Sequence, residues 1–267
     1  QPVDFPQAYN CGRGEHRQEG INGQNVPKPD VELRGKAHDQ QGQSPWLDNL
    51  KRAWLESGEI QRWIDRGVRG ITSNPSIFQK AIESGDEYTE QLTELVHGGS
   101  SITDAYWSMV TDDITAALAL FRPLYDSSGA GDGYVSVEVA PSLARDTDAT
   151  IAMARDLWQR IDRPNLYIKI PATIEGLPAI RQAISEGINV NVTLIFSLDR
   201  YASVMEAFID GLDAASDAGR DITNISSVAS FFISRVDTEV DRRLDAVGTD
   251  QALALRGQAA VAQGQLA

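Results

Sequence analysis

The sequence predicts an α/β protein with the architecture of a TIM (β/α)8 barrel. Short apolar runs alternate along the chain with longer stretches that place apolar residues at helical spacing, which is the pattern of repeated βαβ units and a parallel sheet. Several of the runs carry polar residues on one face, whereas strands of an open doubly wound sheet read as continuous apolar runs. A closed barrel, with an apolar outer face and polar groups collected inside at its C-terminal mouth, fits this pattern better than an open α/β sheet.

Six strands are expected, and helical sequence follows each of them. The strands cover residues 45–48, 68–74, 134–139, 166–170, 188–196 and 225–232. Helical material is expected through Trp54 and Trp63 and over residues 76–84, 87–97, 104–125, 146–160, 177–186, 198–215, 238–247 and 251–263. The longest of these, 104–125, repeats apolar residues every three or four positions, as an amphipathic helix does.

In the later strands, one face is apolar and the other carries polar residues. Val135, Val137 and Val139 alternate with Ser136 and Glu138. The next strand alternates Leu166, Ile168 and Ile170 with Tyr167 and Lys169, and the one after it alternates Ile188, Val190, Val192 and Leu194 with Asn189, Asn191 and Thr193. Because side chains point to opposite faces at successive strand positions, each strand has one apolar face and one face that carries polar groups.

Composition and charge exclude several classes of function. The chain has 267 residues, of which 42% are hydrophobic and 23% charged, and its formal charge of -14 argues against a nucleic-acid or anionic-membrane partner. No apolar run is long enough to span a membrane and no signal peptide is recognisable, so the sequence predicts a cytoplasmic protein. Residues 1–45 contain only ten hydrophobic residues and are expected to be a disordered polar tail, with the folded part over 46–267.

Scarce residue types limit the available chemistry further. Cys11 is the only cysteine and there are three histidines, so neither a thiolate metal site nor a histidine-based triad is expected, and no cofactor is predicted. The chain has only five lysines, and Lys169 is the only one after position 80.

Lys169 lies within an apolar strand, where a lysine is costly. Apolar surroundings disfavour the ammonium form, which leaves the neutral amine that a nucleophile needs. Schiff-base chemistry with a carbonyl substrate is the main use of such a lysine. A lysine whose amine reaches solvent at the strand end, or one paired with Glu138, is the alternative.

Two neighbouring strands would supply groups for imine chemistry. In a barrel, Glu138 and Thr193 point into the same mouth as Lys169, where a carboxylate and a hydroxyl can handle the water that leaves and returns. Asp48, at the end of the first strand, is a candidate for moving the proton of a substrate hydroxyl; the N-cap of the following helix is its alternative role.

Three more side chains are candidates for substrate binding. The amide of Asn74 could orient a substrate hydroxyl, although Asn before Pro is also ordinary turn material. Ser230 and Arg235 flank the end of the sixth strand, and the planar guanidinium of arginine suits phosphate. A surface residue or an ion-pair partner is the alternative for Arg235.

Five ordered segments resemble the transaldolase family, in particular its longer bacterial subfamily. These segments are ITSNPSIF at 71–78, VSVEV at 135–139, YIKIPAT at 167–173, EGINVNVTL at 186–194 and SFFISR at 230–235, with WLD at 46–48 preceding them. The resemblance covers the chain from about residue 46 to 245, and the fixed order of the segments makes it specific.

The resemblance implies a metal-free barrel enzyme of the pentose phosphate pathway that moves a dihydroxyacetone unit between sugar phosphates. Sedoheptulose 7-phosphate and glyceraldehyde 3-phosphate would give erythrose 4-phosphate and fructose 6-phosphate. The resemblance implies catalytic roles for four residues: Lys169 forms the Schiff base, Asp48 is the acid/base for C–C cleavage, and Glu138 with Thr193 activates the water. It implies substrate-binding roles for five more: Asn74 and Asn191 hold hydroxyls, Ser230 with Arg235 contacts phosphate, and Ser136 is a further inner residue.

The sequence departs from the resemblance at its C-terminal end. Only about six of the eight strands are recognisable before Ala267, so the chain is expected to be a C-terminally truncated copy that is inactive or poorly stable alone. Two other functions stay open: a fructose 6-phosphate aldolase-type enzyme that needs no acceptor, and an inactive sugar-phosphate-binding fragment. The oligomeric state is also open.

Overall fold

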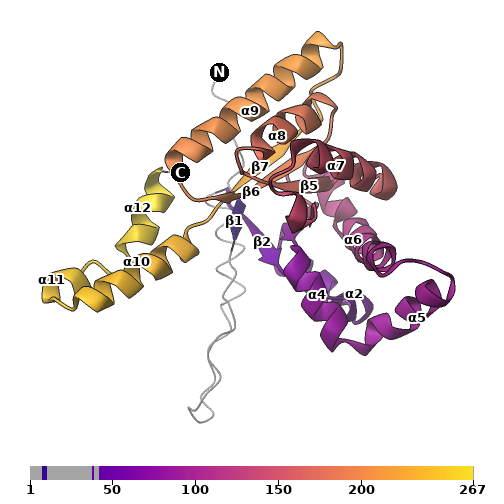
Figure 1. Ribbon diagram of the computed structural model, residues 1–267, viewed down its shortest axis with the longest axis horizontal. Coiled ribbons are helices and arrows are strands. Elements are labelled where there is room, and N and C mark those ends of the chain that lie inside the picture. Colours follow the sequence, from indigo (N-terminus) through magenta and orange to yellow (C-terminus); the bar gives the residue numbers. More distant parts are fainter. Residues whose placement is uncertain (1–7, 11–37, 39–41, 267) are drawn as a thin grey trace. The chain divides into compact units, whose positions relative to one another are not determined.

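The computed structural model describes residues 8–10, 38 and 42–266, and the chain divides into two compact units. The first unit comprises Gln1–Pro141 and Met153–Ile168, and the second comprises Ser142–Ala152 and Lys169–Ala267. Figure 1 labels the helices and strands of both units. Most of the expected disordered tail, residues 1–7, 11–37 and 39–41, lies outside the described residues, so that expectation stays a prediction.

The strands of the first unit run parallel and pair in chain order. They are β1 (Ala8–Asn10), β2 (Ser44–Asp48), β3 (Gly70–Thr72) and β4 (Tyr134–Glu138). Trp46, Leu47 and Asp48 of β2 pair with Gly70, Ile71 and Thr72 of β3, and these pair in turn with Tyr134, Val135 and Ser136 of β4. The N–H of Val135 donates to the carbonyl of Asn165 over 3.1 Å, which brings the start of β5 (Leu166–Pro171) next to β4.

The second unit continues the same order. The N–H of Ala172, just after β5, donates to the carbonyl of Thr193 in β6 (Val190–Ile195) over 2.8 Å, and β6 pairs in parallel with β7 (Ser227–Phe231). The strand order is therefore β1 to β7 without a reversal. A doubly wound sheet reverses its strand order at a switch point, whereas a β/α barrel does not. The predicted fold class is confirmed, and all six expected strands are present as β2 to β7.

Helices follow the strands, as expected from the apolar spacing. After β2 and β3 come α2 (Arg52–Glu56), α3 (Glu59–Asp65), α4 (Pro75–Ser84), η1 (Asp86–Tyr88), α5 (Thr89–His97) and α6 (Ile102–Ser127). Later in the chain come η2 (Pro141–Leu143), α7 (Thr147–Ile161), α8 (Gly176–Ser185), α9 (Leu198–Asp217), α10 (Ser234–Val247), α11 (Asp250–Leu253) and α12 (Gln258–Leu266). In the second unit, α8 and α9 pack side by side (Figure 1).

Local sequence explains where several helices begin and break. The side chain of Asn74 accepts a hydrogen bond from the N–H of Ile77, and Pro75 occupies the first position of α4, so the chain leaves β3 directly into that helix. Residues 251–263 were expected to form one helix. The structure breaks it, because Gly257 adopts a φ of 77° and its N–H donates to Asp241 over 2.9 Å.

An aromatic layer fills one face of the sheet in the first unit. Trp46 and Tyr134 are buried, the rings of Tyr134 and Tyr167 stack with centroids 4.3 Å apart, and Trp46 lies 6.1 Å from Tyr167. Gly70 separates Trp46 from Tyr134 in the sheet and makes room for the indole, because a Cβ at that position would lie 2.5 Å from the ring. The layer packs the sheet just below the polar ends of β2, β3 and β4.

None of the helices in the described ranges is both long enough and apolar enough to cross a membrane.

Candidate active site

Polar residues form a row across the ends of β2, β3 and β4 in the first unit. Asp48 pairs with Thr72, and Thr72 pairs with Ser136. Residues paired across parallel strands have side chains on the same face, so all three lie on the face that carries Trp46 and Tyr134 two positions earlier. The neighbouring row, Leu47, Ile71 and Val135, is apolar. The sequence prediction named Asp48 and Ser136 but not Thr72, which the register places between them.

Glu138 ends β4 two residues beyond Ser136, so it lies on the same face. It acts electrostatically on Tyr106 of α6. Burial and the negative charge of Glu138 together raise the pKa of Tyr106 to about 12. The carboxylate therefore lies within electrostatic reach of this phenol, which the sequence analysis did not single out.

The alternative roles of Asp48 and Asn74 are resolved differently. Asp48 does not cap the next helix, since α2 begins at Arg52 with Lys51 in the N-cap position. Asn74 does cap a helix: its Oδ1 accepts from the N–H of Ile77 over 3.1 Å. The cap uses the oxygen of the amide and fixes its orientation, while the predicted role in substrate binding would use its NH2 group.

Lys169 and two polar residues of β6 are almost completely buried in the second unit. Lys169 exposes 5% of its surface, and Asn191 and Thr193 expose 1% each. This burial contradicts the alternative in which the amine of Lys169 reaches solvent at the strand end. The expected catalytic roles of Lys169 and Thr193 and the expected substrate-binding role of Asn191 stay predictions.

A bulge interrupts β6 next to Thr193. Val192 pairs with Ala229 and Ile195 pairs with Phe231, so three steps along β6 match two along β7. Leu194 adopts a φ of 62°, a conformation that costs a non-glycine residue energy. Bulges redirect side chains and are common next to active sites. The expected alternation through Leu194 therefore fails after Thr193.

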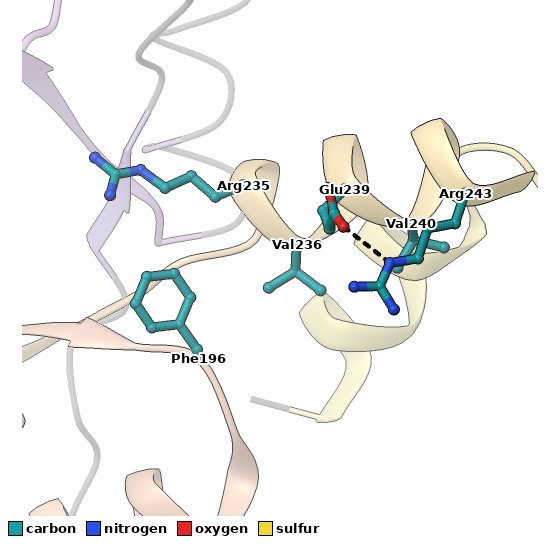
Figure 2. Close-up of a pocket in the computed structure, with 6 residues that line it drawn as sticks. All are labelled: Phe196, Arg235, Val236, Glu239, Val240 and Arg243. Carbon is teal, nitrogen blue, oxygen red and sulfur yellow. Dashed lines mark hydrogen bonds and ion pairs between the residues drawn. The ribbon is translucent and has the colours of Figure 1, made fainter. Parts of the chain in front are cut away.

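Ser230 and Arg235 follow the bulge from β7 into α10. The hydroxyl of Ser230 donates to Oδ1 of Asn191 over 2.9 Å, which orients the amide of Asn191. Arg235 lies in the first turn of α10 with its guanidinium 4.8 Å from the ring of Phe232. It also lines an open pocket of about 320 Å³, in which Glu239 pairs with Arg243 (Figure 2). Arg235 is exposed, which agrees with the alternative of a surface residue.

Within residues 8–10, 38 and 42–266, the structure contains no group of three or more His, Cys, Asp or Glu side chains that could hold a metal ion.

Parallel β/α units with a buried lysine on an inner strand define a class of proteins suited to imine-forming chemistry. The sequence profile of the transaldolase/fructose-6-phosphate aldolase family matches residues 45–265. The chain belongs to this family.

Curated relatives named transaldolase match the same part of the chain. The chain is 54% identical over 227 residues to the transaldolase of Thermobifida fusca (strain YX), covering 85% of this chain and 62% of the relative. It is 53% identical over 228 residues to transaldolase 2 of Streptomyces coelicolor, and 52% identical over 227 residues to the transaldolase of Mycobacterium ulcerans. Each of these two matches covers 85% of this chain and 61% of the relative, so the chain spans about three fifths of their length.

Proposed function

We propose that the protein is a transaldolase, which transfers a dihydroxyacetone unit from sedoheptulose 7-phosphate to glyceraldehyde 3-phosphate. The products are erythrose 4-phosphate and fructose 6-phosphate. The observation that carries the proposal is the buried Lys169 on β5 of a chain in this family. A lysine buried on a strand of parallel β/α units supports a nucleophilic role, because Schiff-base formation with a carbonyl substrate is a main catalytic use of a lysine amine.

The reaction begins with attack of the amine of Lys169 on the ketone carbonyl carbon of the donor. The carbinolamine that forms loses water to give a protonated imine. Glu138 and Thr193 hold and activate this water, with the carboxylate moving the proton and the hydroxyl orienting the molecule. The burial of Thr193 in β6, next to the bulge, supports a fixed orientation for its hydroxyl.

Asp48 then removes the proton of the hydroxyl on C4 of the ketose. The C3–C4 bond breaks, its electron pair passes into the enamine on Lys169, and the aldehyde product leaves. The enamine carbon attacks the acceptor aldehyde, Asp48 returns the proton to the new alkoxide, and water releases the ketose product. The place of Asp48 at the end of β2, outside any helix cap, supports this role.

Five further residues bind the substrate in this proposal. Asn74 and Asn191 donate from their amide groups to substrate hydroxyls, and Ser136 adds a polar group on β4. Ser230 with Arg235 binds the phosphate. Ser230 also contributes indirectly to the binding of hydroxyls, because its hydrogen bond to Asn191 holds the Asn191 amide in one orientation.

A fructose 6-phosphate aldolase-type reaction is the alternative within the family, and an inactive sugar-phosphate-binding fragment is a second alternative. Product analysis separates the three. With fructose 6-phosphate alone, an aldolase releases free dihydroxyacetone and glyceraldehyde 3-phosphate. A transaldolase forms sedoheptulose 7-phosphate only when erythrose 4-phosphate is added, and a fragment that only binds forms neither product. We propose the acceptor-dependent result, with loss of product in Lys169→Ala; this result would overturn the expectation that the chain alone is inactive.

We also propose that the protein acts in the cytoplasm, because its phosphorylated sugar substrates belong to central carbon metabolism.

A further inference from the structure

Thr72 has a buried hydroxyl for which the described part of the chain provides no hydrogen-bond partner. The residue exposes 4% of its surface and lies at the end of β3. Burying an unpaired hydroxyl is unfavourable, so nearly all buried polar groups in folded proteins are paired with protein, water or a ligand. The Thr72 hydroxyl therefore needs an explanation.

The position of Thr72 in the sheet indicates what the hydroxyl faces. Thr72 is the middle residue of the polar row, between Asp48 on β2 and Ser136 on β4. Adjacent strands lie about 4.8 Å apart, so β3 at Thr72 lies about this far from β2 at Asp48 and from β4 at Ser136. Both are residues that the proposed function assigns to the substrate.

Two other hydroxyls of the first unit have hydrogen-bond partners in the free protein, whereas that of Thr72 has none among the described residues. The next residue, Ser73, donates its hydroxyl to the carbonyl of Ser136 over 2.7 Å. Thr111 in α6, which is also buried, donates to the carbonyls of Trp107 and Ser108 over 2.8 and 3.0 Å. Thr111 is thus a buried threonine whose hydroxyl has a structural role, and it provides a matched control.

We propose that Thr72 is a further substrate-binding residue, whose hydroxyl hydrogen-bonds a hydroxyl group of the ketose next to the group that Asp48 deprotonates. This inference rests on the proposed function of the site. A hydroxyl that is unpaired before binding and paired after it stabilises the bound state without stabilising the free protein. The Thr72 hydroxyl therefore lowers the stability of the free protein and strengthens the binding of the ketose.

Three variants separate this role from a structural one. Thr72→Val removes the hydroxyl and keeps the shape, Thr72→Ser keeps the hydroxyl, and Thr111→Val removes a hydroxyl that is paired in the free protein. Each is studied by thermal unfolding without ligand and by borohydride trapping over a range of fructose 6-phosphate concentrations. The trapped adduct is quantified by the mass of the intact protein.

We expect Thr72→Val to unfold at the same temperature as the wild type or higher. Its half-maximal trapping should need about 3- to 10-fold more fructose 6-phosphate, the equivalent of one hydrogen bond. Thr72→Ser should stay close to the wild type in trapping. Thr111→Val should unfold at a lower temperature with unchanged half-maximal trapping.

Two results would overturn the inference while leaving the proposed function intact. One is trapping of Thr72→Val at wild-type concentrations, and the other is a loss of thermal stability as large as that of Thr111→Val, which would show a partner in the free protein. Absence of any adduct in the wild type would instead refute the imine chemistry, and the inference about Thr72 with it.

Discussion

Replacing Asp113 by asparagine tests whether its contacts with Arg52 and Tyr88 are as closely packed as the structure indicates. Asp113 lies in α6 and exposes 3% of its side chain. It accepts a hydrogen bond from Nε of Arg52 over 2.7 Å and another from the hydroxyl of Tyr88 over 2.6 Å. Burial raises the pKa of the Asp113 carboxyl, and the hydrogen bonds from Tyr88 and Arg52 oppose that rise.

The expected loss follows from the burial of the partner. Arg52 exposes only 13% of its side chain, and its guanidinium lies 4.3 Å from the ring of Tyr88. Asp113→Asn would leave this cation without its counter-charge in a poorly solvated place, which typically costs about 3 to 5 kcal/mol. For a chain of this size, such a loss lowers Tm by about 6 to 20 °C.

Chemical denaturation followed by circular dichroism measures this loss. The exposed pair Arg122–Asp126 provides a matched control, since its N···O distance is 2.8 Å but its side chains are 48% and 55% exposed. Asp126→Asn should change the free energy of unfolding by about 0.5 kcal/mol or less. An equal, small effect of both substitutions would refute the reasoning, because it would place the Arg52–Asp113 pair in solvent.

Three further predictions concern the sheet and the site. Because the pKa of Tyr106 is raised to about 12, stability should fall as the pH rises from 10 to 12, and Tyr106→Phe should flatten this fall in denaturation curves; an unchanged slope would contradict the assignment. Gly70→Ala should cost about 1 to 3 kcal/mol, since its Cβ would collide with Trp46, and a neutral result by denaturation would show that the aromatic layer is loosely packed. Leu194→Gly should stabilise the protein by up to about 1 kcal/mol and Leu194→Val should destabilise it, because φ is 62° at this position; the reverse order would argue against the left-handed conformation.

Alternating patterns predicted the strands well because each strand has two different faces. The Val/Ser/Val/Glu run of β4 and the Leu/Tyr/Ile/Lys run of β5 gave both the location of the strands and the buried Lys169. Strand ends were less accurate. The predicted strand over 68–74 continues to Asn74, whereas β3 ends at Thr72 because the side chain of Asn74 caps α4.

Features that depend on pairing between strands could not be predicted. The bulge at Leu194 arises from the register of β6 against β7, while the sequence of β6 alternates regularly through that point. Thr72 was missed for the same reason: its neighbours Asp48 and Ser136 are distant in sequence, and only the register places them beside it. The strand β1 lies in a polar segment without periodicity, so no pattern indicated it.

The imine on Lys169 is the central claim, and covalent trapping tests it most directly. The protein is reduced with borohydride in the presence of fructose 6-phosphate, digested, and the modified peptide is identified by mass spectrometry. We predict a three-carbon adduct on the peptide that contains Lys169 and no adduct in Lys169→Ala. An adduct that persists in Lys169→Ala, or that maps to another lysine, would contradict the claim.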